Sequence, residues 1–392
     1  MEILFWCLII IVVYTYLGYG LLLYLLILIK RVFTKKTAKI DRNFQPEVTF
    51  IVAAYNEERW ITEKIRNSIS QQYPKDKIRY VFITDGSDDG TPEIVQNFQA
   101  PEGIRIDLYH QPERKGKIAA VNRVLPLITS PIIIFTDANT QLNPEAVANI
   151  VRHYANPTIG AVAGEKRISL GQKNEASGAG EGIYWKYESL LKKWDAELYS
   201  VVGAAGELFS VRTSLHDFIP PDTICEDFYT TLKVAMKGYK VAYEPEAFAV
   251  EGHSASVSEE LKRKIRIAAG GLQALVRLSP LLNPFQYGVL SFQYVSHRVL
   301  RWTLAPLALP LILLLNIYLA VYQHSFYLFI LFLQIFFYTL AMIGYIFEKK
   351  KIKFKPFFIP YYFCMMNYAV YRGFFRFLSG KQTVLWEKAK RA

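Results

Sequence analysis

The sequence has few cysteines and no evident repeats. Its three cysteines, Cys7, Cys225 and Cys364, lie far apart and form no CxxC pair, which argues against a disulfide framework and a cysteine-based zinc site. No GxGxxG follows the first predicted strand, which argues against a dinucleotide site of the Rossmann type. Acidic residues are also fewer than basic ones, 34 against 46, so the formal net charge is +12. Such an excess of positive charge can indicate binding to nucleic acid, to anionic lipid or to a phosphate-rich ligand.

Hydrophobic residues are abundant, at 52% of the chain, and they gather towards the two ends. Residues 3–29 contain no charged side chain and can cross a hydrocarbon layer of about 30 Å. Basic residues follow directly, and the positive-inside bias then places the N-terminus outside and the middle of the chain in the cytoplasm. Residues 299–322 and 326–347 are predicted to form a transmembrane hairpin. Much of the net charge flanks these runs, so membrane topology accounts for it without nucleic acid.

The last apolar stretch, residues 357–378, is ambiguous. It contains Pro360, Asn367, Arg372 and Arg376, and the tail after it is basic. A full crossing would leave that tail outside, against the positive-inside bias. An interfacial or re-entrant segment is therefore favoured, and a true span stays open as the alternative.

The middle of the chain alternates short apolar runs with amphipathic helical patterns. Residues 48–54, 80–84, 104–109 and 132–136 read as strands buried on both faces. This alternation predicts an α/β domain with a mostly parallel sheet. Ligands of such sheets bind beyond the carboxyl ends of the strands, and polar residues follow the apolar runs here.

Two of these strand ends carry acidic loops. Asp85 begins an acidic, glycine-rich loop that suits a base and ribose better than phosphates. After the fourth strand, Asp137, Asn139 and Gln141 alternate, and on an extended segment they would face one side. Three oxygen ligands in that arrangement suit Mg²⁺ or Mn²⁺. Ordinary polar turns before helix caps remain the alternative for both loops.

The ordered set of motifs closely resembles family 2 glycosyltransferases with a GT-A fold, including poly-N-acetylglucosamine, hyaluronan and cellulose synthase-like proteins. The set comprises Tyr55-Asn56-Glu57, the Asp85 loop, Lys115-Gly116-Lys117 leading to Asn122, and Asp137-x-Asn139. The resemblance implies that the nucleotide-sugar is held by Ala53, Tyr55, Glu57, Asp85, Lys117, Asp137 and Arg263. It implies a metal at Asp137, Asn139 and Gln141. Most members have a second Asp at the place of Asn139, so dependence on Mg²⁺ or Mn²⁺ is less certain here.

The catalytic residues implied by the resemblance are Asp227, Glu226 and Arg266. Cys225-Glu226-Asp227 looks like a Thr-Glu-Asp motif whose Asp is the catalytic base, and an attacking hydroxyl does need to lose its proton. The alternative is that the two carboxylates only begin a helix.

Residues 259–278 predict an amphipathic helix at the membrane surface. Related synthases carry Gln-x-x-Arg-Trp on such a helix, whereas this chain keeps only the arginine, Arg266, which could clamp a diphosphate. For Arg263, contact with anionic lipid is the alternative. The missing Gln and Trp favour a lipid or short-glycan acceptor slightly over a long polysaccharide.

These observations predict a membrane-embedded, inverting transferase that uses a nucleotide-diphospho-sugar, with UDP the expected nucleotide, and serves polysaccharide biosynthesis in the cell envelope. The alternative is a non-catalytic membrane subunit that keeps the GT-A fold. The expected divisions are a transmembrane helix at 1–30, a cytoplasmic catalytic domain at 46–255, interfacial helices at 256–297, a transmembrane hairpin at 298–348, and a membrane-associated end at 349–392. We expect a multi-pass protein of the plasma or inner membrane.

Overall fold

The computed structural model describes residues 1–33, 41, 43–169, 176–252, 256–323, 325–350, 352, 355–380 and 385. The strands are β1 (Val48–Ala54), β2 (Ile78–Asp85), β3 (Arg105–Gln111), β4 (Ile132–Asp137), β5 (Thr140–Leu142), β6 (Ile159–Ser169), β7 (Leu208–Arg212) and β8 (Lys240–Gly252). The helices are α1 (Glu2–Val13), α2 (Tyr19–Phe33), α3 (Glu58–Ile69), α4 (Thr91–Gln96), α5 (Lys117–Val124), α6 (Ala146–Val151), α7 (Ala176–Leu198), α8 (Glu226–Met236), α9 (Val257–Arg277), α10 (Pro284–Tyr287), α11 (Val289–Tyr294), α12 (Leu300–Trp302), α13 (Leu304–Tyr322), α14 (Ser325–Lys349) and α15 (Lys355–Leu378).

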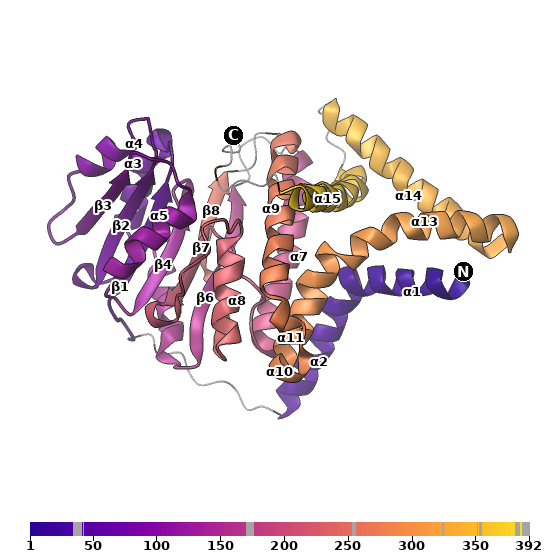
Figure 1. Ribbon diagram of the computed structural model, residues 1–392, viewed down its shortest axis with the longest axis horizontal. Helices are drawn as coiled ribbons and strands as arrows, with labels where there is room; N and C mark the ends of the chain where they lie inside the picture. Colours follow the sequence, from indigo (N-terminus) through magenta and orange to yellow (C-terminus); the bar gives the residue numbers. More distant parts are fainter. Residues whose placement is uncertain are drawn as a thin grey trace.

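One sheet with the order β3-β2-β1-β4-β7-β6-β8-β5 forms the centre of the domain (Figure 1). The pairs among β3, β2, β1 and β4 are parallel, as is β6 with β8, whereas β7 and β5 pair antiparallel with their neighbours. The four predicted strands are confirmed with small shifts at their ends. The mostly parallel sheet is confirmed as well.

Both faces of the sheet are buried, as the continuous apolar runs predicted. In β2, Val81 and Ile83 contribute to one core, which includes α5, α8 and α9, while Tyr80 and Phe82 contribute to the other, with α3 and α6. This alternation follows from the two-residue repeat of a strand. Helices on both sides therefore fix the strand ends where the polar loops begin.

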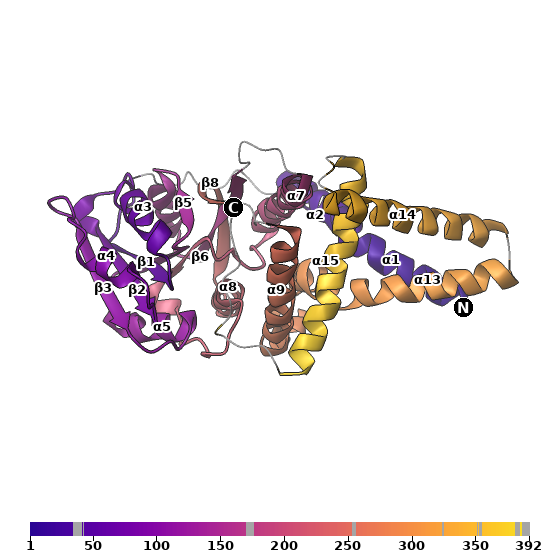
Figure 2. The same ribbon diagram turned by 90° about the horizontal axis from the view of Figure 1, so that it is seen from above.

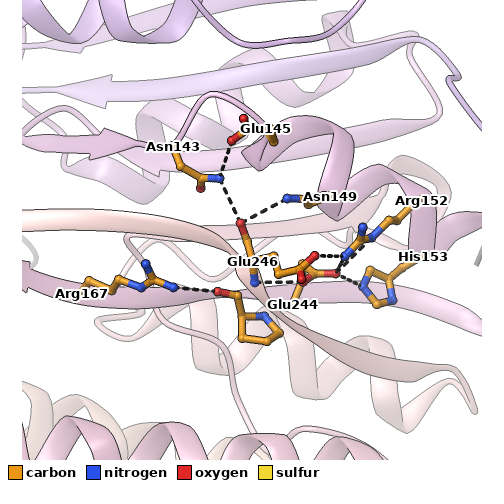
Figure 3. A network of polar contacts seen from close by, with 9 residues as sticks. Asn143, Glu145, Asn149, Arg152, His153, Arg167, Glu244 and Glu246 are labelled. Atoms are coloured by element: carbon orange, nitrogen blue, oxygen red, sulfur yellow. Dashed lines mark hydrogen bonds and ion pairs between the residues drawn. The ribbon is translucent and has the colours of Figure 1, made fainter. Parts of the chain in front are cut away.

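A polar network holds β8 where its pairing with β6 is interrupted. The register shifts between Gly164 and Glu165, which pair with Glu244 and Phe248. The buried Glu244 carboxylate accepts hydrogen bonds from Arg152, at 2.7 Å, and lies 2.8 Å from the His153 ring (Figure 3). Because the charged side chains Arg152, Glu244 and Glu246 pair with one another within the domain, we assign the network a structural role.

Within the part of the chain that the structure describes, three helices are long and apolar enough to cross a membrane: Glu2–Phe33, Leu304–Tyr322 and Ser325–Lys349. The first bends at a π-helical turn, Tyr14–Gly18, so that α1 and α2 run in different directions (Figure 1), and such turns are a known cause of kinks. The second starts later than predicted because the backbone leaves helical geometry at Thr303.

Helix α15 runs across the direction of α13 and α14 and lies beside α9, between them and the domain (Figure 2). This orientation supports the predicted interfacial placement, which stays a prediction. In α9 the predicted apolar face contacts protein, since Leu272 and Leu275 lie in the core and Ala268 meets Gly373 of α15. Except for Leu385, residues 381–392 of the predicted membrane-associated end lie outside the described part.

Buried charges join the first apolar helix, α7 and the segment before α13. Glu188 on α7 pairs with Arg298 at 2.6 Å and with Arg301 at 2.9 Å. Asp195, two turns further along α7, lies 2.6 Å from the His297 ring and accepts a hydrogen bond from Tyr19 of α2. We call Glu188, Asp195, His297, Arg298 and Arg301 the junction cluster.

Candidate active site

The carboxyl ends of β1, β2 and β4 lie side by side. Ala53 is the direct partner of Asp137, and Ala54 is the partner of Thr84, which precedes Asp85. The parallel arrangement therefore brings three loops that are far apart in the sequence to one edge of the sheet, as predicted.

Asp85 organises the loop that leads into α5. One carboxylate oxygen, Oδ2, accepts hydrogen bonds from the backbone N–H groups of Lys115 and Gly116, at 2.9 and 2.6 Å. Gly116 has a φ of 97°, which a glycine adopts without strain. Oδ1 is buried and has no hydrogen-bond partner among the described residues. A buried carboxylate oxygen without a donor is costly, so a ligand that donates a hydrogen bond fits this position.

Lys117 lies between two carboxylates that follow different elements. Its Nζ is 2.9 Å from Asp137 Oδ1 and 2.5 Å from Glu226 Oε1. Burial alone would lower the pKa of Lys117, but Asp137 and Glu226 raise it above its usual value. The β4 end and the start of α8 are thus joined by an ammonium group at the centre of the predicted site.

The predicted nucleoside residues Tyr55 and Glu57 lie in the loop after β1. The Arg114 guanidinium lies over the Tyr55 ring, 3.6 Å from its centroid. The Glu57 backbone N–H donates to Thr91 Oγ1 at 2.8 Å and so ties this loop to the one after β2. The two loops therefore form one wall beside Asp85.

The structure contradicts the extended segment expected to carry the three metal ligands. The chain turns at Ala138 and Asn139, and Gln141 lies on β5, where it pairs with Val250 of β8. Alternation along a strand therefore does not align Asp137, Asn139 and Gln141. No group of three His, Cys, Asp or Glu side chains suited to a metal occurs in the described residues. Asp137 alone offers a carboxylate at this turn.

A lysine that the sequence analysis did not single out forms hydrogen bonds on both sides of the turn at residues 138–139. Lys64 of α3 is fully buried and donates to Thr136 Oγ1 and to the Thr140 carbonyl, both at 2.9 Å. Burial lowers the pKa of Lys64 to about 7. Lys64 lies on the same helical face as Ile61 and Ile65. This pattern could have identified it from the sequence, since a buried lysine needs specific partners.

Asp227 follows Glu226 in the first turn of α8. Burial and then the neighbouring Glu226 raise the pKa of Asp227 to about 7, which suits a group that takes up a proton near neutral pH. A Cβ on Gly206 would lie 3.7 Å from Asp227 Oδ2. The loop 203–206 therefore lies beside Asp227.

The two arginines of α9 differ in their surroundings. Arg266 is close enough to Glu226 and Asp137 for both to oppose the lowering of its pKa by burial. Arg263 is buried and forms two hydrogen bonds with Glu260, each 2.9 Å long. Its predicted role in nucleotide-sugar binding stays a prediction, and so does the alternative of contact with anionic lipid.

Beyond Arg263 lies a group of buried charges that the sequence did not reveal. Lys166 of β6 pairs with Glu207 and, at 2.5 Å, with Glu251. Although burial acts to raise it, Lys166 lowers the pKa of Glu207 to about 2. Glu207 in turn contributes to the raised pKa of Asp227, so this group adjoins the predicted base.

His216 is a second residue that no motif indicated. It lines the same hollow as Lys117 and Glu226, and neither ring nitrogen has a partner among the described residues. Burial lowers the pKa of His216 to about 4.

The middle of the chain matches the family described as Glycosyl transferase family 2, over residues 49–217. The poly-beta-1,6-N-acetyl-D-glucosamine synthase of Staphylococcus aureus strain COL is 28% identical over 238 residues, and that of Staphylococcus epidermidis strain RP62A is 26% identical over the same length. Each match covers 59% of this chain and 56% of the relative, so the chain spans just over half of those proteins.

A solved structure is similar over nearly the whole chain. It is the mannosyltransferase PcManGT from Pyrobaculum calidifontis in complex with GDP-Man and Mn²⁺, 25% identical, with a TM-score of 0.72 and coverage of 96% of this chain and 99% of that one. The sheet described above and this similarity agree on the GT-A fold. Residues 49–217 are therefore similar to family 2 glycosyltransferase domains, in a chain whose described residues also include three candidate membrane-spanning helices.

Proposed function

We propose that the protein is an inverting glycosyltransferase that moves a sugar from a nucleotide-diphospho-sugar to a lipid-linked or polysaccharide acceptor at the membrane. The observation that carries this proposal is the convergence of Asp85, Asp137, Glu226 and Asp227 around Lys117. The domain family and the GT-A fold support it.

The nucleoside is assigned to the loops after β1 and β2. The unpaired Asp85 Oδ1 suits a base or ribose that donates a hydrogen bond, and a uracil N–H is such a donor. Ala53, Tyr55 and Glu57 line the neighbouring loop. A UDP-sugar is the donor that we expect.

The diphosphate is assigned to Lys117, Arg266 and the β4 turn. The Asp137 carboxylate is partly exposed, at 33% of the side chain, so it fits as a ligand of Mg²⁺ or Mn²⁺, whereas Asn139 and Gln141 are not aligned with it. When bound, the cation would neutralise charge on the diphosphate leaving group. Lys117 and Arg266 offer positive charge at the same place.

In the proposed transfer, Asp227 takes up the proton of the acceptor hydroxyl. The acceptor hydroxyl oxygen forms a bond to the anomeric carbon as its proton passes to the Asp227 carboxylate. The bond from that carbon to the diphosphate oxygen breaks, and the nucleoside diphosphate leaves with the electron pair. Gly206 leaves room beside Asp227 for the acceptor.

The placement in the membrane follows from the three apolar helices. With the basic residues after the first helix inside, the domain lies in the cytoplasm of a multi-pass protein. The proposed partners are the donor, the acceptor and the lipid bilayer.

The experiment is Asp227→Asn in the full-length protein. The amide cannot take up the proton, so we expect transfer to fall by about 10²–10⁴-fold, while nucleotide binding, measured calorimetrically, persists. Asp217→Asn is the matched control, because Asp217 is half exposed on the surface and pairs with Lys237. Wild-type turnover in Asp227→Asn would refute the assignment of the base.

A non-catalytic subunit is the second candidate, favoured by the neutral Asn139 and by the ammonium already placed against Asp137. Hydrolysis of a panel of nucleotide-sugars by purified protein separates the two. Nucleotide binding without hydrolysis or transfer, with and without Mn²⁺, would support the non-catalytic candidate.

A further inference from the structure

Helix α7 presents Trp185, Glu188, Lys192 and Asp195 along one face, since these positions repeat every three or four residues. Glu188 and Asp195 belong to the junction cluster, in which each has several partners. Lys192 lies between them and is only 2% exposed. Within the described residues its ammonium group has no hydrogen-bond acceptor and no ion-pair partner, and it lies 5.9 Å from the centroid of the Trp185 ring.

An ammonium group carries three N–H donors, and burying them without acceptors costs free energy. In agreement, burial lowers the pKa of Lys192 despite nearby carboxylates such as Glu188. The missing acceptors are what a bound anion would supply.

Trp185 is surrounded by cations from three different elements. Besides Lys192, the ammonium groups of Lys166 on β6 and Lys264 on α9 lie 5.2 and 5.4 Å from its ring centroid. Cations over an aromatic ring occupy the surface on which a sugar would stack. Lys166 and Lys264 also have carboxylate partners, Glu207 and Glu251 for the first and Glu260 for the second, so Lys192 is the cation whose charge a bound anion would balance.

The site adjoins the acceptor side of the proposed active site. Lys166 pairs with Glu207, which follows Gly206, and Gly206 borders Asp227. It also adjoins the membrane part of the molecule. Helix α7 packs along α2 and α15, and Lys30 at the end of the first apolar helix donates to the carbonyls of Glu197 and Leu198 at 2.7 and 2.8 Å.

We propose that Lys192, Lys166 and Lys264 around Trp185 bind the phosphate of an anionic lipid, and that this lipid presents a headgroup hydroxyl to Asp227. The inference rests on the proposed function and narrows its acceptor to a phospholipid. The phosphate oxygens supply the acceptors that Lys192 lacks, with the strength of charge-assisted hydrogen bonds.

The test uses the full-length protein in detergent and three short probes: dioctanoyl phosphatidylinositol, the uncharged dioctanoyl glucosylglycerol, and free inositol phosphate. We expect the phospholipid to bind and raise the unfolding temperature, the uncharged glycolipid to bind at least about tenfold more weakly, and free inositol phosphate to bind weakly because it lacks the chains. Equal binding of the two lipids would overturn the inference. Equal binding of free inositol phosphate would overturn the lipid source.

The variants are Lys192→Met and the control Lys193→Met, whose lysine is exposed on the next position of α7. Loss of one charge-assisted hydrogen bond predicts a Kd for the phospholipid at least about tenfold higher in Lys192→Met and an unchanged Kd in Lys193→Met. Without ligand, Lys192→Met should be as stable as wild type or more stable, because it removes an unpaired buried charge. Lower stability with unchanged binding would show a structural role and overturn the inference.

Hydrolysis of the donor by the wild-type protein is measured alongside. Absence of hydrolysis and transfer would count against the proposed function itself. Hydrolysis without preference for the phospholipid would count against the inference alone.

Discussion

At the scale of single residues, we expect the proposed base Asp227 to set the pH dependence of sugar transfer. Burial and Glu226 raise its pKa to about 7, so the carboxylate becomes protonated as the pH falls through that value. A protonated base cannot accept the acceptor proton, and we predict that kcat/KM falls about tenfold per pH unit below about pH 7. Glu226→Gln removes the neighbouring negative charge and should move this limb to lower pH. A pH profile of kcat/KM that is flat from pH 5 to 8 would contradict the prediction.

At the scale of elements, the contact between α15 and α9 depends on a glycine. A Cβ on Gly373 would lie 2.6 Å from Ala268 Cβ and 2.9 Å from the Ala269 backbone nitrogen, so no side-chain rotation can make room. We predict that Gly373→Leu forces the helices apart, costs about 1–3 kcal/mol and reduces donor turnover, because α9 carries Arg266.

The unfolding temperature and the rate of donor hydrolysis check this prediction. Gly373→Ala should show a smaller change of the same sign. Phe374→Ala is the control, because Phe374 is 37% exposed and its removal creates no clash. A fully stable and active Gly373→Leu variant would show that the two helices are not packed together as described.

At the scale of the whole molecule, the junction cluster attaches the membrane helices to the sheet domain. Glu188→Gln removes the carboxylate that pairs with the buried Arg298 and Arg301, and breaking such a pair costs about 3–5 kcal/mol. We predict a lower unfolding temperature in detergent. Glu197→Gln is the control on the same helix. Its partner Arg31 is solvent-exposed, and an exposed ion pair contributes little to the free energy of unfolding.

This stabilisation also depends on pH. Although burial acts to raise it, Arg298 and His297 hold the pKa of Glu188 well below its usual value. A depressed carboxyl pKa contributes stability above the unfolded pKa of about 4.5, and that stability is lost as the pH falls towards the folded pKa. The gap in unfolding temperature between wild type and Glu188→Gln should therefore narrow below about pH 4.5, and a constant gap would contradict this origin.

Local pattern predicted the strands and the strand-end loops well, because continuous apolar runs and parallel topology are both visible in the sequence. It therefore placed Asp85 and Asp137 in one region, and the resemblance to family 2 glycosyltransferases added Asp227. It failed at Asn139, where a sharp turn replaces an extended segment, since a short polar stretch after a strand does not distinguish the two. It also missed Lys166, Lys192 and His297, because their partners lie on elements distant in the sequence and only the tertiary packing brings them together.

The Lys117 ammonium group cancels the repulsion between Asp137 and Glu226 as long as no nucleotide is bound. A diphosphate bound as proposed would compete for that ammonium group and would leave the two carboxylates without the positive charge between them. A divalent ion would then be stabilised there more strongly than in the protein without nucleotide. Under the proposal, binding of the nucleotide and binding of the ion would therefore be linked through one side chain, and each would increase the affinity for the other.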